Sequence, residues 1–193
     1  MELWQLAAAV LMALALRRWC FELIRVQGNS MAPTLRGGDM LWVTRFDYRK
    51  RAPHRQDLVI CYYPGRYLRR WKRVRQCFVK RVVGLPGETV SICEGVVYID
   101  GKPLREPYLD PARNRRSYGM EPVTLGEREV FVLGDNRDNS NDSRRVGPIP
   151  LEMLRGRVRR VLCHLAWLER RPRRRLHRRR RRLALPQSSK GQR

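Results

Sequence analysis

A serine in a turn-forming segment near the start of the chain could act as a nucleophile. The segment from Gly28 to Leu35 reads GNSMAPTL and follows an apolar stretch. Gly28 lets the backbone approach another segment closely, and Pro33 fixes the turn that follows. An isolated serine is most often a turn residue. Ser30 is therefore a candidate nucleophile only if the chain also supplies a base to take its proton.

The base that the sequence offers is a lysine inside an apolar segment, residues 78–88 (FVKRVVGLPGE). The two-residue period of a strand places Phe78, Lys80 and Val82 on one face. If that face lies in the core, Lys80 loses hydration and its pKa falls, so a neutral amine is available as a general base near pH 7. An outward face with a solvated lysine is the alternative that this strand alone leaves open.

A polar loop, residues 134–144 (GDNRDNSNDSR), follows another apolar segment. An ordinary surface loop is one interpretation. A calcium loop is another, but the glycine and the terminal glutamate of that signature are missing. The close spacing of aspartate and arginine favours a loop that is braced by internal ion pairs.

These three segments, in this order, resemble those of the bacterial type I signal peptidases, the leader peptidase family of the Ser–Lys serine peptidases. The resemblance covers roughly residues 17–165 and includes GNSMAPTL, GDMLWV, DLVICYYP, VKRVVGLPGE and GDNRDNSNDSR. The last two motifs together are highly specific. Relatives of the eukaryotic reticulum use histidine as the base, so Lys80 is typical of the bacterial or organellar type.

The resemblance implies a role for each polar residue of these motifs. Ser30 is expected to be the nucleophile, Lys80 the general base, and Ser140 the residue that holds the lysine amine in line. The ion pairs that it implies beside the site are Arg81 with Asp135, and Asp142 with Arg144. No metal or cofactor is implied.

The resemblance also concerns the oxyanion hole. The backbone N–H of Ser30 is expected to supply one donor. Some family members carry a serine two positions before the nucleophile as the second donor, whereas this chain has Gly28 there, as short members often do. The second donor must therefore be a backbone group or another residue.

Such enzymes resemble one another in requiring small residues at positions −1 and −3 of the substrate. The side chains expected to line the corresponding pockets are Val26, Met31, Leu35, Phe78 and Val79. Ordinary core packing is the alternative for each of them.

The elements that must position these residues are short strands. Alternating or continuous apolar segments predict strands at 39–44, 57–63, 76–83, 89–92, 96–99, 129–133 and 156–164. Asp100-Gly101 is typical of a hairpin turn, and residues 108–122 are polar enough to be a loop or a reduced lobe. The predicted fold is mainly β: a signal-peptidase-like β-barrel or folded sheet with one N-terminal transmembrane helix.

Three parts are expected along the chain: a membrane anchor at 1–24, a catalytic domain at 25–168 and a disordered tail at 169–193. The apolar run from about Leu3 to about Cys20 favours a span, with Trp4 and Trp19 at the interfaces. A cleavable signal peptide and a buried core helix stay open as alternatives. Charge bias alone would keep Arg17 and Arg18 in the cytoplasm, and this opposes export of the catalytic domain.

The composition suits one folded domain with a strongly basic tail. The chain has 193 residues, 42% of them hydrophobic, and a formal net charge of +24. Residues 169–193 contain twelve Lys or Arg and one acid. This charge indicates attraction to polyanions such as anionic lipid, wall polymer or nucleic acid. The five cysteines form no C-x-x-C pair, which disfavours a zinc site or a disulfide framework.

Together with the apolar N-terminus, the resemblance implies a single-pass peptidase that removes signal peptides from preproteins at the outer face of the plasma membrane, and we expect a monomer. Two enzyme alternatives are a pilus-maturation protease and a self-cleaving repressor, and the full loop 134–144 opposes both. The non-enzyme alternative is a nucleic-acid-binding protein. The apolar N-terminus and the lack of aromatic residues within the basic run oppose it.

Overall fold

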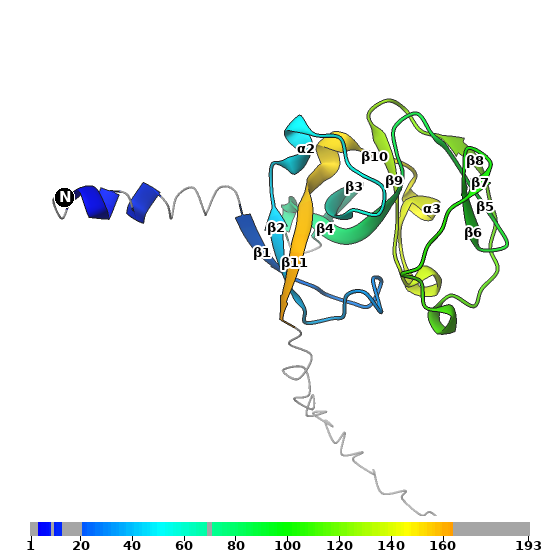
Figure 1. The fold of residues 1–193 in the computed structure, drawn as a ribbon, viewed down its shortest axis with the longest axis horizontal. Coiled ribbons are helices and arrows are strands. Elements are labelled where there is room, and N and C mark those ends of the chain that lie inside the picture. Colours follow the sequence, from blue (N-terminus) through cyan, green and yellow to red (C-terminus); the bar gives the residue numbers. More distant parts are fainter. Residues whose placement is uncertain (1–3, 9, 13–20, 69–70, 164–193) are drawn as a thin grey trace, which may run out of the picture.

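The computed structural model describes residues 4–8, 10–12, 21–68 and 71–163 of the chain (Figure 1). The strands are β1 (Phe21–Arg25), β2 (Met40–Thr44), β3 (Leu58–Leu68), β4 (Trp71–Gly84), β5 (Thr89–Cys93), β6 (Val96–Ile99), β7 (Lys102–Pro103), β8 (Met120–Thr124), β9 (Glu129–Leu133), β10 (Ile149–Pro150) and β11 (Leu154–Cys163). The short helices of the domain are α2 (Asp47–Lys50), α3 (Ser143–Val146) and the 3-10 turns η1 (Pro111–Arg113), η2 (Arg137–Asn139) and η3 (Leu151–Met153).

The strands form two antiparallel sheets. The larger has the order β1-β2-β11-β3-β4-β9-β10, and the smaller has the order β7-β6-β5-β8. Figure 1 shows the smaller sheet on the side of the domain where β9 and α3 lie. The predicted mainly β fold with antiparallel sheets is confirmed. Closure into a barrel is not among the pairings of the described strands, because the larger sheet runs from β1 at one edge to β10 at the other.

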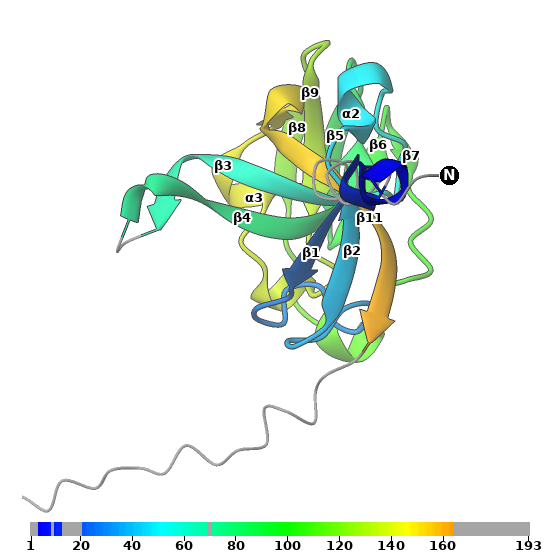
Figure 2. The same ribbon diagram turned by 90° about the vertical axis from the view of Figure 1, so that its left-hand side faces the viewer.

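The central hairpin of the larger sheet, β3 with β4, carries the lysine. Figure 2 shows these two strands side by side along most of their length. Val59 pairs with Lys80, and Cys61 pairs with Phe78. Val59, Cys61 and Val82 are fully buried in one core cluster, against which Phe78 packs. β-Branched and aromatic residues suit a pleated surface that is covered on both faces, and this explains the continuous apolar run of β3.

The larger sheet begins earlier than the expected domain boundary. The first four residues of β1 lie inside the segment 1–24 that we assign to the anchor, yet every residue from Phe21 to Arg25 pairs with β2. Exposure alternates along β1, with Glu22 and Ile24 half-buried and Phe21, Leu23 and Arg25 exposed, which is the pattern of a strand with one covered face. Residues 21–24 therefore contribute a strand to the sheet.

Half of the expected anchor and the whole of the expected tail lie outside the described residues. Residues 4–8 and 10–12 are helical, and their side chains are exposed. Among the helices that the structure describes, none is both long and apolar enough to cross a bilayer. Residues 1–3, 9, 13–20 and the tail 169–193 are not described, so the transmembrane helix and the disordered tail stay predictions.

Candidate active site

The structure brings the predicted nucleophile and the predicted base into contact. Lys80 Nζ donates a hydrogen bond to Ser30 Oγ at 2.8 Å and another to the carbonyl oxygen of Val79 at 3.0 Å. Fifty residues separate Ser30 from Lys80 along the chain. Their contact depends on β4 on one side and on the loop that follows β1 on the other.

The burial of Lys80 explains its acid–base properties. Its side chain is only 2% exposed, and its amine lies 6.0 Å from the centre of the Phe78 ring. Loss of hydration lowers the pKa of Lys80 below its ordinary value, although Asp142 and Asp135 oppose this shift. Strand alternation left open whether Lys80 faces the core or the solvent. In the structure, Lys80 faces the core.

The loop that carries Ser30 comprises residues 26–39 between β1 and β2, and we call it the serine loop. It is held by the polar loop 134–144. The backbone N–H of Asn136 donates to the carbonyl oxygen of Ser30 at 3.0 Å, and the Asn136 side chain donates to the carbonyl oxygen of Asn29 at 3.1 Å. Gly28 has φ +84°, a conformation that favours glycine. Open space surrounds the position of an added Cβ at Gly28. A serine there would therefore meet backbone strain and not a collision.

The first ion pair beside the site joins β4 to the polar loop. Arg81 Nε and Nη2 donate to the two carboxylate oxygens of Asp135 at 2.8 and 2.6 Å, a bidentate geometry. Thr34, on the same loop as Ser30, donates its hydroxyl to Asp135. The pair therefore fixes β4, the polar loop and the serine loop to one another next to Lys80.

The second ion pair closes the polar loop on itself. Arg144 Nε and Nη2 each donate to the Asp142 carboxylate at 2.8 Å. Asp142 also accepts from the backbone N–H of Gly134 at 3.1 Å. Burial acts to raise the pKa of Asp142, but the Arg144 guanidinium and the Gly134 N–H hold this pKa below its usual value. Asp142 is therefore an anion at neutral pH.

Ser140 lies at the centre of these contacts. Its Oγ is buried and forms no hydrogen bond of ordinary geometry within the described part of the chain, but its hydroxyl is close enough to Asp142 to help lower the pKa of that carboxyl. A Cβ added at Gly134 would collide with this Oγ, so Ser140 stands directly against Gly134. The expected contact from Ser140 to the Lys80 amine is not among the hydrogen bonds of the described residues, and the orienting role stays a prediction.

A strap of residues 104–119, which overlaps the stretch 108–122 predicted as a loop or a reduced lobe, contacts the polar loop. Glu106 accepts from Arg137 Nη1 at 3.1 Å and from the hydroxyl of Tyr108 at 2.6 Å. The Tyr108 ring in turn lies 3.8 Å from the guanidinium of Arg81. Arg144 Nη2 donates to the carbonyl oxygen of Arg137 at 2.8 Å. The Glu106 carboxylate thus links the two ion pairs, to Arg81 through Tyr108 and to Arg144 through Arg137.

Sequence reasoning missed Glu106 and Tyr108 because their roles depend on partners about thirty residues away. The only signal was a glutamate and a tyrosine in a segment with little apolar character. The side chains of Glu106 and Arg137 are 6% and 1% exposed, so the charged groups of the pair are almost completely buried. Removal of one charge from a buried pair leaves the other charge uncompensated, which is strongly destabilising.

We expect Glu106→Gln to lower the free energy of unfolding by about 3 kcal/mol and to reduce peptide cleavage, because Arg137 no longer holds the loop. Urea denaturation and a peptide-cleavage assay on the same preparation measure both effects. Glu121→Gln, at an exposed position of β8, is the matched control and should change neither quantity. Equal stability of the two variants would contradict the role given to Glu106.

The five residues that we expect in the substrate pockets differ in burial. Val26, Met31 and Leu35 are at most 5% exposed and lie in one core cluster, against which Val79 packs. Phe78 packs against a different cluster and stacks on Tyr63, with 4.1 Å between the ring centres. Three of the five thus fill the core beneath the serine loop. The pocket assignment stays a prediction.

The Cys61 thiol does not offer a second nucleophile beside Ser30. Burial raises the pKa of the Cys61 thiol to about 12, so this thiol is protonated at neutral pH and is a poor nucleophile. Cys61, Cys77 and Cys93 are free thiols. Within the described ranges, no cluster of His, Cys, Asp and Glu could hold a metal ion.

Comparison with known proteins gives a family match over most of the chain. The family model described as "Signal peptidase, peptidase S26" matches residues 2–163. A probable signal peptidase I-1 of Synechocystis sp. is 38% identical over 152 residues, 78% of this chain and 76% of that protein. The signal peptidase I of Bacillus caldolyticus is 32% identical over 166 residues, 80% of this chain and 86% of that protein.

Two further similarities were found. A probable chloroplastic thylakoidal processing peptidase 2 of Arabidopsis thaliana is 34% identical over 77% of this chain and 40% of its own length. A crystal structure of a signal peptidase I from Enterococcus faecalis is 32% identical, with a TM-score of 0.46, over 56% of this chain and 98% of that chain.

Proposed function

Because this chain belongs to the signal peptidase family, peptidase S26, we propose that Ser30 and Lys80 form the dyad with which it cleaves signal peptides. The family match shows a hydrolase of the signal peptidase I type, a serine endopeptidase. The observation that supports the dyad is the 2.8 Å contact between Lys80 Nζ and Ser30 Oγ, with the lysine buried.

In the proposed reaction, Lys80 is the general base. Once its amine is neutral, the contact with Ser30 directs the nitrogen lone pair at the hydroxyl proton. Ser30 Oγ then attacks the scissile carbonyl carbon, and the proton passes to Lys80. The amine returns it to the leaving nitrogen and then activates the water that hydrolyses the acyl-enzyme.

The backbone N–H of Ser30 is the proposed oxyanion donor. It forms no hydrogen bond with the residues that the structure describes, so it is free to stabilise the negative oxygen of the tetrahedral intermediate. The Asn136 side chain donates to the carbonyl oxygen of Asn29 at 3.1 Å, and this carbonyl belongs to the same peptide group as the Ser30 N–H, so the contact holds the donor in place. A donor that is fixed before the reaction needs no reorganisation as the charge develops.

The proposed substrates are exported preproteins, and the proposed place of action is the extracytoplasmic face of the plasma membrane. The names of the relatives support the substrate class, since they are signal peptidases I and a processing peptidase. We propose that residues 1–20 anchor the enzyme as a single-pass protein and that it acts as a monomer. Small residues at −1 and −3 of the substrate are proposed to contact pockets that are lined by Val26, Met31, Leu35, Phe78 and Val79.

The proposal is tested by incubating the detergent-solubilised protein with a labelled preprotein and mapping the cut. We expect one cleavage, directly after a small residue at the end of the signal peptide. Cleavage at several sites within the mature part of the preprotein would contradict the assignment.

The rate of cleavage should rise with pH as Lys80 loses its proton. Because burial lowers the pKa of Lys80 below its ordinary 10.5, the midpoint of kcat/KM against pH should lie well below that value. The unfolded chain binds the proton more tightly, so the contribution of Lys80 to stability should rise with pH between the two pKa values. Measurement of kcat/KM and urea stability over this range checks both directions. A midpoint at or above 10.5 would mean that Lys80 is solvated.

A further inference from the structure

We infer that a basic cleft outside the proposed active site binds the phosphate of an anionic phospholipid headgroup. The cleft has a volume of about 860 Å³ and is lined by Arg45, Arg51, Arg128 and Arg155, together with three aromatic side chains. None of its lining residues belongs to the serine loop, to β4 or to the polar loop 134–144. We call it the arginine cleft. The inference adds a lipid site to the proposed peptidase.

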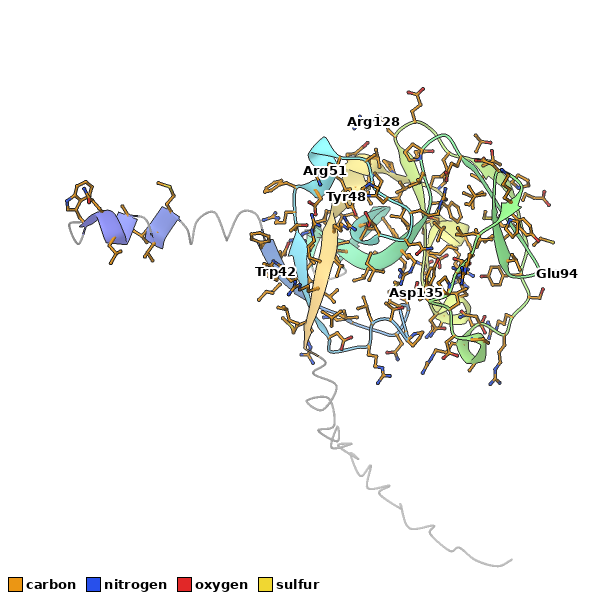
Figure 3. All side chains as sticks on the ribbon, in the orientation of Figure 1. Trp42, Tyr48, Arg51, Glu94, Arg128 and Asp135 are labelled. Carbon is orange, nitrogen blue, oxygen red and sulfur yellow. The ribbon has the colours of Figure 1, made fainter. Side chains whose placement is uncertain are left out.

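The charge of the arginine cleft is poorly balanced. Glu152 is the one carboxylate among its lining residues. Arg155 and Arg45 share a single partner, Glu22 of β1, at 2.5 and 3.8 Å. Neither Arg51 nor Arg128 has an ion pair within the described ranges of the chain. Figure 3 shows Arg51, Arg128 and Tyr48 near one edge of the domain, away from Asp135. Such a site attracts an anion with several oxygen acceptors.

The rim of the cleft contributes apolar surface as well as charge. Phe46 lines the cleft and is 37% exposed. Tyr62 lies on its inner side, with the Arg155 guanidinium 5.8 Å from the ring centre. The Tyr48 hydroxyl donates to Asp57 at 3.0 Å, and burial raises its pKa, so this tyrosine stays neutral. Arginine with aromatic side chains suits the boundary between lipid headgroups and acyl chains.

The position of the cleft in the chain indicates a lipid rather than a soluble anion. The apolar N-terminal segment leads into β1, whose first residue, Phe21, pairs with Thr44, and Thr44 directly precedes two lining residues. Phe21, Leu23 and Trp42 are 39%, 55% and 36% exposed, and the rings of Phe21 and Trp42 are 5.3 Å apart. Exposed apolar side chains and a basic cleft thus adjoin the point where the proposed anchor meets the domain.

The test uses the full chain in phosphatidylcholine vesicles that also contain phosphatidylglycerol with a photoreactive headgroup. After illumination, mass spectrometry maps the labelled peptides. We expect label on residues 45–52 and 151–155. The double variant Arg51→Gln, Arg128→Gln should lower this label about tenfold. Label on the tail should not change, so the tail serves as an internal reference.

The matched control is Lys102→Gln with Arg115→Gln, which removes the same charge at exposed positions outside the cleft. Equal loss of label in both double variants would show a general charge effect and overturn the inference. If a water-soluble photoreactive glycerol phosphate, added without vesicles, labelled the cleft as strongly as the lipid does, the site would be one for a free phosphate and the lipid assignment would be overturned. The inference rests on the proposed membrane anchor, and the experiment distinguishes a missing anchor from a missing lipid site. If the anchor is missing, the protein does not sediment with neutral vesicles. If only the lipid site is missing, the protein sediments with them and the cleft stays unlabelled.

Discussion

Replacement of Ser30 or Lys80 by alanine is expected to lower kcat/KM for a signal-peptide substrate by about 10⁴-fold or more, since each removes one half of the proposed nucleophile–base pair. Lys80→Met should fail equally and fills nearly the same buried space. Lys80→Arg should fail too, because a guanidinium stays protonated and cannot accept the Ser30 proton. Ser140→Ala should cost less, since its proposed role is to orient the amine.

The measurement is kcat/KM on purified variants, with circular dichroism to confirm that each is folded. Ser30→Ala, prepared in the same host, sets the background from contaminating wild-type enzyme. If Lys80→Met kept near-normal cleavage above that background, another residue would be the base and the Ser–Lys mechanism would be wrong for this chain. If Ser30→Ala kept activity, the nucleophile would have to be found elsewhere.

Gly134→Ala is expected to reduce kcat/KM by about 100-fold or more, although residue 134 contacts no substrate in the proposed mechanism. An added Cβ would lie 2.5 Å from the carbonyl oxygen of Ser30 and would also collide with Ser140 Oγ. Backbone at this distance must move, and Ser30 moves with it. A misplacement of about 1 Å at a reacting group can cost about 100-fold in rate.

Gly156→Ala is the matched control, because its Cβ would also collide with a backbone carbonyl oxygen, that of Thr44, within the β2–β11 pairing. Both variants should be destabilised, so activity is compared per folded molecule at a temperature where both are folded. Gly134→Ala should be far less active than Gly156→Ala. Similar activities would show that the serine loop tolerates displacement.

Most of the fold and the two residues of the proposed dyad could be predicted from the sequence. The strands at 40–44, 89–93, 96–99 and 129–133 lie within one residue of the predicted ones, because turns with Gly, Pro or Asp bound short alternating segments. Asp100 and Gly101 adopt positive φ in the predicted hairpin turn. Strand alternation also predicted that Lys80 shares a face with Phe78 and Val82, since this property is local to one strand.

Other features depended on contacts between distant segments, and only the tertiary structure decided them. Whether the face of Lys80 looks into the core depends on what packs against β4, and the pairing with β3 and the serine loop settled it. The same holds for Glu106, whose partner Arg137 is 31 residues away. Its carboxylate is indistinguishable from a surface glutamate until the strap folds over the polar loop. Val26 and Leu35 were assigned to pockets by position, and the structure places both in the core.

The position of the arginine cleft likewise could not be predicted from the sequence. The sequence gives the net charge of +24 but not where it acts, and its densest basic run is the tail. Arg45, Arg51, Arg128 and Arg155 are scattered over about 110 residues and converge only because the segments beside α2, the residue before β9 and the start of β11 line one cleft. Local periodicity fixes the face on which a side chain lies, whereas burial and electrostatic partners are set by long-range packing. For this protein, the sequence therefore determined the strands and the residue types of the proposed dyad, and the tertiary structure determined their environment.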